Sequence, residues 1–148
     1  MKSSKVLGLL IAVIQIVSAI ALILGMQSML GVFSTALPSG EQEIDIQNTD
    51  PVVIPFNLTP RNNGYLEATM DVSVSMIVNG TEVANDSRSV IIPAGSFTPV
   101  DLELTMPLAD AQDYFERSDL QFKTDIKVTS LYDLISFSNH MVIEGGAQ

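Results

Sequence analysis

The sequence contains no cysteine, no tryptophan and a single histidine among its 148 residues. A chain without cysteine has no disulfide framework, no thiol nucleophile, no thiolate metal site and no lipid-modified cysteine anchor. The one histidine, His140, has no carboxylate beside it at the spacing of a metal site, and strand alternation places it on a polar face with Ser136 and Ser138. A lone surface histidine of this kind is typically solvated, so it predicts no catalytic role.

Sequence motifs for other chemistries are missing as well. The chain has no Gly-rich phosphate loop and no Asp-x-Asp-x-Asp-Gly calcium loop. Asp110, Asp113 and Glu116 recur at helical spacing, but acidic residues near a helix start ordinarily compensate the helix dipole. A weak calcium site among the acidic loops stays open as an alternative. No catalytic, cofactor-binding or metal-ligating residue and no small-molecule substrate is therefore assigned.

Basic residues are scarce, with seven Lys and Arg against 17 Asp and Glu. All 17 acidic residues lie beyond residue 40 together with five of the basic ones, which gives that part a net charge of −12. Such a surface repels phosphates, so the charge argues against a nucleic-acid partner and against lying flat on anionic lipid. Solubility alone is a sufficient explanation for the acidic surface.

A long apolar run from Val6 to Met26 dominates the N-terminal part. Its ~20 residues would form a helix ~30 Å long, which matches the hydrocarbon core of a bilayer. Val, Leu and Ile make up most of the run, and their favourable transfer into lipid outweighs the penalties of Gln15 and Ser18. We therefore expect a permanent single-pass transmembrane helix, with the lipid bilayer as its first partner.

Two other interpretations of the N-terminal segment involve cleavage. A secretory signal peptide would use Lys2 and Lys5 as its basic region and Ser34-Thr35-Ala36 as its cleavage site, but secretory apolar regions run only ~7–15 residues. A type IV pilin leader needs a basic and a small residue directly before the apolar helix, and Ser4-Lys5-Val6 fits that pattern poorly.

The orientation of the chain follows from its charges. Lys2 and Lys5 flank the N-terminal end of the apolar run, whereas the first charges after it are acidic, so the positive-inside rule places the N-terminus in the cytoplasm. The expected organisation is a cytoplasmic stub (1–5), a transmembrane helix (6–26), an amphipathic juxtamembrane helix and linker (27–40) and an extracytoplasmic β-domain (41–148).

One helical stripe of the apolar run carries small and amide side chains, namely Gly8, Ala12, Gln15 and Ala19. Small residues let two membrane helices approach closely, and an amide can hydrogen-bond across their contact. The stripe therefore predicts a helix-packing surface for a second copy or another envelope protein. The alternative is that these residues simply occur in a passive anchor.

The apolar pattern continues at helical spacing beyond the bilayer length. Met26, Met29, Leu30, Phe33 and Leu37 alternate with polar residues, which indicates an amphipathic continuation of the helix. A helix from Val6 to Leu37 would be ~48 Å long, so its excess should lie along the interface, pack on a partner or form the neck of a stalk. Pro38-Ser39-Gly40 then ends the helix and marks the domain boundary.

After Gly40 the apolar period changes from 3.6 to 2, as in half-buried strands. The clearest strand places Met70, Val72 and Val74 on one face, and Asn79-Gly80 is a strong hairpin signal. Pro107 begins a short helix that runs to Phe115. Seven strands are expected, over residues 43–47, 52–56, 66–78, 81–92, 100–106, 120–128 and 135–143.

This pattern predicts an all-β fold, an immunoglobulin-like antiparallel β-sandwich of about seven strands with one short helix, preceded by the long N-terminal transmembrane α-helix. Four stretches within residues 43–143 also carry a family resemblance: 48–55 (NTDPVVIP), 78–84 (VNGTEVA), 91–96 (IIPAGS) and the helix 108–115. In this order they are similar to the LEA14-like, WHy-related family of late-embryogenesis-abundant domains. The resemblance implies a β-sandwich without known catalytic residues, linked to stress tolerance and carried in some relatives on a single membrane span.

Three Asn-x-Ser/Thr triplets would be candidate glycosylation sites in an external domain. Pro60 makes Asn57 a poor acceptor, so Asn79 and Asn85 are the candidates. The turn at Asn79-Gly80 explains Asn79 equally well.

Together these features predict a non-enzymatic envelope protein that displays its β-domain as a structural or protein-interaction module. The alternative is a pilin-like or archaellum-accessory subunit, in which the N-terminal helices bundle in a surface filament or its anchor. The stripe and the amphipathic continuation fit either function.

Overall fold

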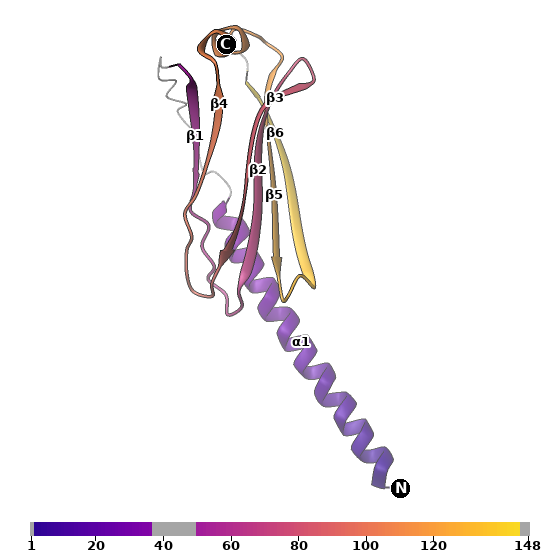
Figure 1. Ribbon diagram of the computed structural model, residues 1–148. Helices are drawn as coiled ribbons and strands as arrows, with labels where there is room; N and C mark the ends of the chain where they lie inside the picture. The colour runs from indigo at the N-terminus through magenta and orange to yellow at the C-terminus, as the bar shows by residue number, and fades with distance from the viewer. Residues whose placement is uncertain (1, 37–49, 146–148) are drawn as a thin grey trace.

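The computed structural model describes residues 2–36 and 50–145, with side chains described from Val6 onward. Figure 1 shows a long helix, α1 (Lys2–Ala36), whose last turns enter a domain of antiparallel strands. The described residues form six strands: β1 (Val52–Leu58), β2 (Ala68–Val78), β3 (Thr81–Ile92), β4 (Val100–Met106), β5 (Leu120–Ser130) and β6 (Ile135–Gly145). A short helix, α2 (Leu108–Phe115), follows β4.

The described residues contain six of the seven expected strands, and they confirm antiparallel β-structure after a long apolar helix. The expected strand over 43–47 and the helix end at Pro38-Ser39-Gly40 lie outside the described residues. The strands form a two-stranded sheet, β1-β4, and a four-stranded sheet, β3-β2-β5-β6, with every pair antiparallel.

Strand alternation decides which faces are buried. In β4 every second residue from Val100 to Met106 is buried, and in β2 the buried face includes Met70, Val72 and Val74, as the sequence predicts. The turn at Asn79-Gly80 joins β2 to β3 with positive φ at both residues, 52° and 73°. This is the backbone of a tight two-residue hairpin, so the local prediction is confirmed.

The core lies between the two sheets in two clusters of buried side chains. The cluster next to α2 joins Ile54, Met76 and Leu104 to Ala111 of that helix. The cluster at the other end of the domain joins strand residues such as Met70 and Leu102 to α1. The three buried apolar side chains that α1 contributes there are Met29, Val32 and Ala36.

The helix α1 has two halves with different surroundings. Residues 6–24, the exposed half, have no buried side chain, whereas the docked half, residues 25–36, contains buried Gly25, Ser28, Met29, Val32 and Ala36. The span Val6–Ala36 is long and apolar enough to cross a membrane, as a membrane anchor or a signal sequence would be.

The docked half differs from the neck of a stalk, because it packs on the chain's own strands. Met29 and Phe33 lie on the packed side, as the amphipathic pattern predicts, but Met26 and Leu30 are exposed. The face that docks is instead rotated toward Gly25 and Ser28, since small residues let the strands and loops approach the helix axis.

Candidate functional site at the helix junction and the outer sheet face

The junction between α1 and the β-domain is held by two hydroxyl groups of the helix. Ser28 Oγ accepts the backbone N–H of Leu66 at 3.0 Å, and Thr35 Oγ1 accepts the backbone N–H of Arg61 at 2.7 Å. Ser28 and Thr35 are two helical turns apart and therefore lie on the same side of α1. The loop between β1 and β2 thus lies along the docked half and is hydrogen-bonded to it at both ends.

Glycines make this close approach geometrically feasible. A Cβ atom on Gly64 would lie 2.5 Å from Cα of Ser28, and one on Gly31 would lie 3.1 Å from the backbone N of Asn63. A Cβ atom on Gly25 would lie 2.6 Å from Cδ1 of Ile135, the first residue of β6. At Gly31 and Gly64 the helix and the β1–β2 loop therefore meet without room for a further side chain, and at Gly25 the helix backbone meets the side chains that begin β6 and precede it.

Asn62 fixes the shape of the same loop from inside. Its side chain is fully buried, with Nδ2 donating to the carbonyl oxygens of Leu66 (2.7 Å) and Ile92 (3.0 Å) and Oδ1 accepting the N–H of Gly64 (2.9 Å). Every buried side-chain N or O atom of the described residues has a hydrogen-bond partner. A satisfied buried amide of this kind selects one loop conformation, so the junction is rigid.

An aromatic pair packs the docked half against β6. The ring of Phe33 meets the ring of Phe137 in β6 edge to face, with centroids 4.6 Å apart. Such pairs add roughly 0.5–1.5 kcal/mol beyond the area they bury. The docked half of α1 is thus a structural element of the β-domain.

The four residues of the predicted helix-packing stripe lie away from this junction. Gly8, Ala12, Gln15 and Ala19 all belong to the exposed half, and a Cβ atom on Gly8 would meet nothing within 4 Å. The β-domain therefore leaves the stripe accessible. Its use as a contact between membrane helices stays a prediction.

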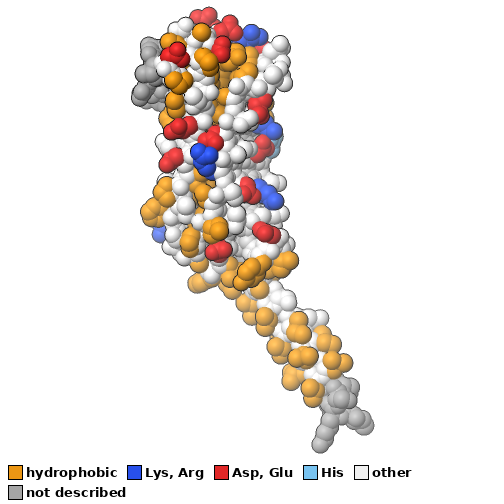
Figure 2. Space-filling model, in the orientation of Figure 1, with side chains coloured by type: hydrophobic (Ala, Val, Ile, Leu, Met, Phe, Trp, Pro, Cys, Tyr) orange, Lys and Arg blue, Asp and Glu red, His pale blue; other side chains and the backbone are white. Residues whose placement is uncertain are grey.

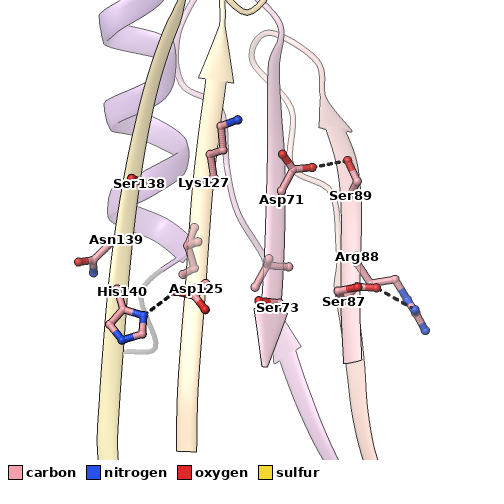
Figure 3. Close-up of a pocket in the computed structure, with 12 residues that line it drawn as sticks. Asp71, Ser73, Ser87, Arg88, Ser89, Asp125, Lys127, Ser138, Asn139 and His140 are labelled. Atoms are coloured by element: carbon pink, nitrogen blue, oxygen red, sulfur yellow. Dashed lines mark hydrogen bonds and ion pairs between the residues drawn. The ribbon is translucent and has the colours of Figure 1, made fainter. Parts of the chain in front are cut away.

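The outer face of the four-stranded sheet is polar across all four strands. The strand registers place Ser89, Asp71, Lys127 and Ser138 in one row, and Ser87, Ser73, Asp125 and His140 in the next. An open hollow of about 430 Å³ lies over these rows, and Figure 3 shows side chains from all four strands around it. This is the expected polar face of β6, extended over its neighbours.

One close polar contact on the outer face pairs Asp125 with His140. Oδ1 of Asp125 lies 2.5 Å from Nδ1 of His140, and Oδ2 lies 3.2 Å from Nζ of Lys123. The hydrogen bond from His140 holds the pKa of Asp125 below its usual range, and the Lys123 ammonium lowers that pKa further, against the opposing effect of partial burial. His140 therefore has a carboxylate partner that the sequence interpretation did not assign to it.

This arrangement brings polar side chains of neighbouring strands together. Asp125 is the one hydrogen-bond partner of His140 in the described part of the chain, so no serine hydroxyl completes a Ser-His-Asp arrangement. The same residues contain no group of three His, Cys, Asp or Glu side chains placed to hold a metal ion. Asp110 and Asp113 are exposed within α2, and Glu116 is exposed directly after it.

Both candidate glycosylation sites lie on the surface. Asn79 is exposed in the β2–β3 turn, and Asn85 is exposed in β3, where its side chain hydrogen-bonds the carboxylate of Glu82. The positive φ of Asn79 accounts for asparagine at that position without a glycan. Glycosylation at either residue stays a prediction.

The junction residues that sequence analysis did not identify are Ser28, Thr35, Asn62 and Gly64. Ser28 bonds a residue 38 positions away and Thr35 one 26 positions away, so no local pattern marks these contacts. The only sequence signal is the set of small and hydroxyl residues at helical spacing between Gly25 and Ala36. That set resembles the stripe of the exposed half, and its local pattern indicates only an amphipathic continuation of the helix.

Comparison with known proteins gives no family. No protein-family model matches the chain, and no curated protein matches it. The resemblance to LEA14-like domains therefore stays a prediction.

Solved structures resemble the chain only distantly. A Bacteroides uniformis β-glucuronidase is 8% identical, with a TM-score of 0.43 over 65% of this chain and 12% of its own. A Paenibacillus cycloisomaltooligosaccharide glucanotransferase is 21% identical, with a TM-score of 0.36 over 67% and 12%. A protein from Archaeoglobus fulgidus is 14% identical, with a TM-score of 0.37 over 74% and 93%. The chain thus spans about an eighth of the two enzymes, and likenesses this weak carry no functional argument.

Proposed function

We propose that this protein is a single-pass membrane protein that displays its β-domain outside the cell as a non-enzymatic structural or protein-interaction module. The observation that carries the proposal is the division of α1 into an exposed apolar half and a docked half within one helix. An apolar helix surface ~28 Å long is unstable in water and stable in a bilayer.

The docked half favours a retained anchor over a cleaved signal peptide. Cleavage at Ser34-Thr35-Ala36 would remove Met29 and Val32, which are buried in the domain core. It would also remove the acceptor that Ser28 provides for Leu66. A mature domain without these residues would expose part of its core, so the proposed protein keeps its helix.

The proposed orientation follows from charge. Lys2 and Lys5 lie at the free end of the helix, and the part beyond residue 40 carries a net charge of −12. The positive-inside rule therefore favours a cytoplasmic N-terminus and an external β-domain.

The proposed fold of the external domain is an immunoglobulin-like β-sandwich related to LEA14-like domains. Its support is two antiparallel sheets with buried faces on a common core, and an edge contact in which Asp86 Oδ2 accepts the N–H of Glu103 at 3.0 Å. Such domains serve as binding and spacing modules. The polar outer face, with its hollow beside Asp125 and His140, is the surface available to a protein partner.

A second candidate function is that of a pilin-like or archaellum-accessory subunit. The specific observation in its favour is that the exposed half carries the stripe of Gly8, Ala12, Gln15 and Ala19, while the docked half holds the β-domain at one end. Helices of this kind could bundle in the core of a filament, with acidic β-domains on its outside.

The state of the purified native protein separates the two functions. An envelope protein should be extracted by detergent as a discrete species beginning at Met1, and N-terminal sequencing and electron microscopy would detect this. An extended polymer lacking the first residues would instead favour the filament subunit. For the topology, protease added to wall-less intact cells should digest residues beyond Gly40, and full protection there until lysis would reverse the orientation.

A further inference from the structure

Four large apolar side chains stand exposed around the point where α1 leaves the β-domain. Tyr65, Phe97, Tyr132 and Leu134 have 72, 63, 99 and 75% of their surface exposed. They belong to the three loops that join β1 to β2, β3 to β4 and β5 to β6, at the end of the domain from which the helix emerges (Figure 1). Figure 2 shows hydrophobic side chains gathered at this end and continuing along the helix. We call these four residues the basal ring.

We propose that the basal ring inserts into the membrane–water interface and seats the β-domain directly on the lipid. This inference rests on the membrane anchor proposed above and adds a second contact with the bilayer. The partner of the basal ring is the membrane–water interface of the bilayer, because the ring is continuous with the apolar surface of the exposed half.

The length of the exposed half leaves no spacer between membrane and domain. Residues 6–24 span ~28 Å, close to the ~30 Å of a hydrocarbon core. The next residue, Gly25, already packs against Leu131 and Ile135 at the base of the domain. A helix that fills the bilayer with its exposed half therefore brings the basal ring to the membrane surface.

The turn between β5 and β6 extends beyond Gly25 toward the N-terminal end of the helix. A groove of about 860 Å³ lies between the two, with Val17 and Leu24 on the helix side and Tyr132 and Leu134 on the turn side. The turn thus stands beside the last two turns of the exposed half, at the depth where interfacial residues contact acyl chains. Lipid chains would contact the apolar side chains of the groove, whose lining also includes the carboxylates of Glu67 and Asp133.

The backbone of this turn supports a functional role. Leu131, Tyr132 and Asp133 all have positive φ, at 57°, 55° and 65°. Tyr132 and Asp133 are the central residues of a tight turn in which the N–H of Leu134 donates to the carbonyl oxygen of Leu131 at 3.2 Å, and non-glycine residues in the left-handed region cluster at functional segments. This turn presents the almost fully exposed Tyr132 close to Leu134. Tyrosine suits a membrane–water interface because its ring is apolar and its hydroxyl can hydrogen-bond to water.

The charges of the same loops exclude attachment by charge alone. Arg61, Glu67 and Asp133 are exposed there, one basic residue against two acidic ones. Anionic lipid is attracted by basic clusters, which this end does not have among its described residues. Insertion should therefore be driven by apolar contact and proceed equally in zwitterionic lipid.

The chain contains no cysteine, so single-cysteine variants of the full-length protein report one site each. Tyr132→Cys and Phe97→Cys would carry a fluorophore on the basal ring, and Ala109→Cys on the exposed surface of α2 would be the matched control. The protein is reconstituted in phosphatidylcholine vesicles containing lipids with a nitroxide near the acyl carbonyl. Val13→Cys with a nitroxide deep in the acyl chain reports on the anchor itself.

Labels at residues 97 and 132 should lose most of their fluorescence to the nitroxide near the acyl carbonyl. The label at residue 109 should keep its fluorescence. The label at residue 13 should be quenched by the deep nitroxide. Quenching at residue 13 without quenching at 97 and 132 would overturn the seated domain and leave the anchor intact. No quenching at residue 13 would overturn the anchor as well. Quenching at 97 and 132 that requires added anionic lipid would overturn insertion by apolar contact.

Discussion

The two halves of α1 are both rich in apolar residues, yet they present different side chains to their surroundings. The exposed half carries large aliphatic side chains over nearly its whole circumference, as in Leu9, Ile16 and Ile23. The docked half instead presents Gly25, Ser28 and Gly31 to the domain, where close approach and hydrogen bonding matter more than hydrophobicity. Lipid adapts to any apolar surface, whereas a packed protein core accepts only a complementary one. Apolar composition alone therefore cannot tell where an anchor ends and a core begins.

The largest expected effect comes from placing a charge in the docked half. Val32→Asp would bury an unpaired carboxylate at a fully buried position, at a cost of several kcal/mol against a total stability of ~5–15 kcal/mol. The β-domain should unfold, as measured by circular dichroism of the full-length protein in detergent. Leu30→Asp, at a position 61% exposed in the same half, is the control and should remain folded. Equal effects would mean that the docked face is assigned wrongly.

A smaller effect is expected from one methyl group at the junction. Gly64→Ala would place a Cβ atom 2.5 Å from Cα of Ser28, and relieving that overlap should cost about 1–3 kcal/mol of unfolding free energy. Denaturant unfolding in detergent measures the loss. Gly8→Ala makes the same substitution in the exposed half, where nothing lies within 4 Å, and should leave stability unchanged. An unchanged midpoint for Gly64→Ala would show that the junction is looser than its geometry indicates.

The predicted stripe of the exposed half should act on association. Replacing Gly8 and Ala12 by Leu keeps the helix apolar but blocks close approach, so self-association in a membrane should weaken by about 1 kcal/mol while insertion persists. Crosslinking of full-length protein in vesicles measures this. Val13→Leu with Val17→Leu, off the stripe, is the control. If wild type, stripe variant and control crosslink equally, the exposed half is a passive anchor.

The smallest expected effect on stability comes from a substitution on the outer sheet face, away from both halves of α1. The contact with His140 lowers the pKa of Asp125, so its contribution to stability is present above the usual carboxyl pKa and is lost as the pH falls through the lowered value. Both side chains are about half exposed, so Asp125→Asn should cost no more than about 1 kcal/mol at neutral pH. Urea unfolding between neutral and acidic pH tests this, with Asp101→Asn as an exposed control. A larger loss would make the polar face a stability element.

Local patterns predicted much of the β-domain. The period-two alternation around Val72 and the Asn79-Gly80 turn are decided by residues next to each other in the chain, and both are confirmed. The short helix after Pro107 follows from the same kind of signal. Such features need no knowledge of the rest of the fold.

The junction could not be predicted in this way, because its partners meet only when the domain has formed. Ser28 is hydrogen-bonded to Leu66, 38 residues away in the sequence, and Asn62 to Ile92, 30 residues away. The contact of Asp125 with His140 depends likewise on the β5–β6 register, which pairs these residues directly. A sequence shows that Ser28 and Asn62 are polar; it does not show which backbone groups they will satisfy.

The continuity of α1 has a mechanical consequence. From Lys2 to Ala36 the helix has no break, and its docked half packs into the core through Val32 and is hydrogen-bonded to the β1–β2 loop by Ser28 and Thr35, so the helix and the β-domain should move together without a hinge. β2, with 11 residues, is ~36 Å long, so a change of ~10° in helix tilt would displace the far end of the sheet by ~6 Å. If the helix is the membrane anchor proposed above, bilayers of different thickness would thus turn the polar face in measurably different directions.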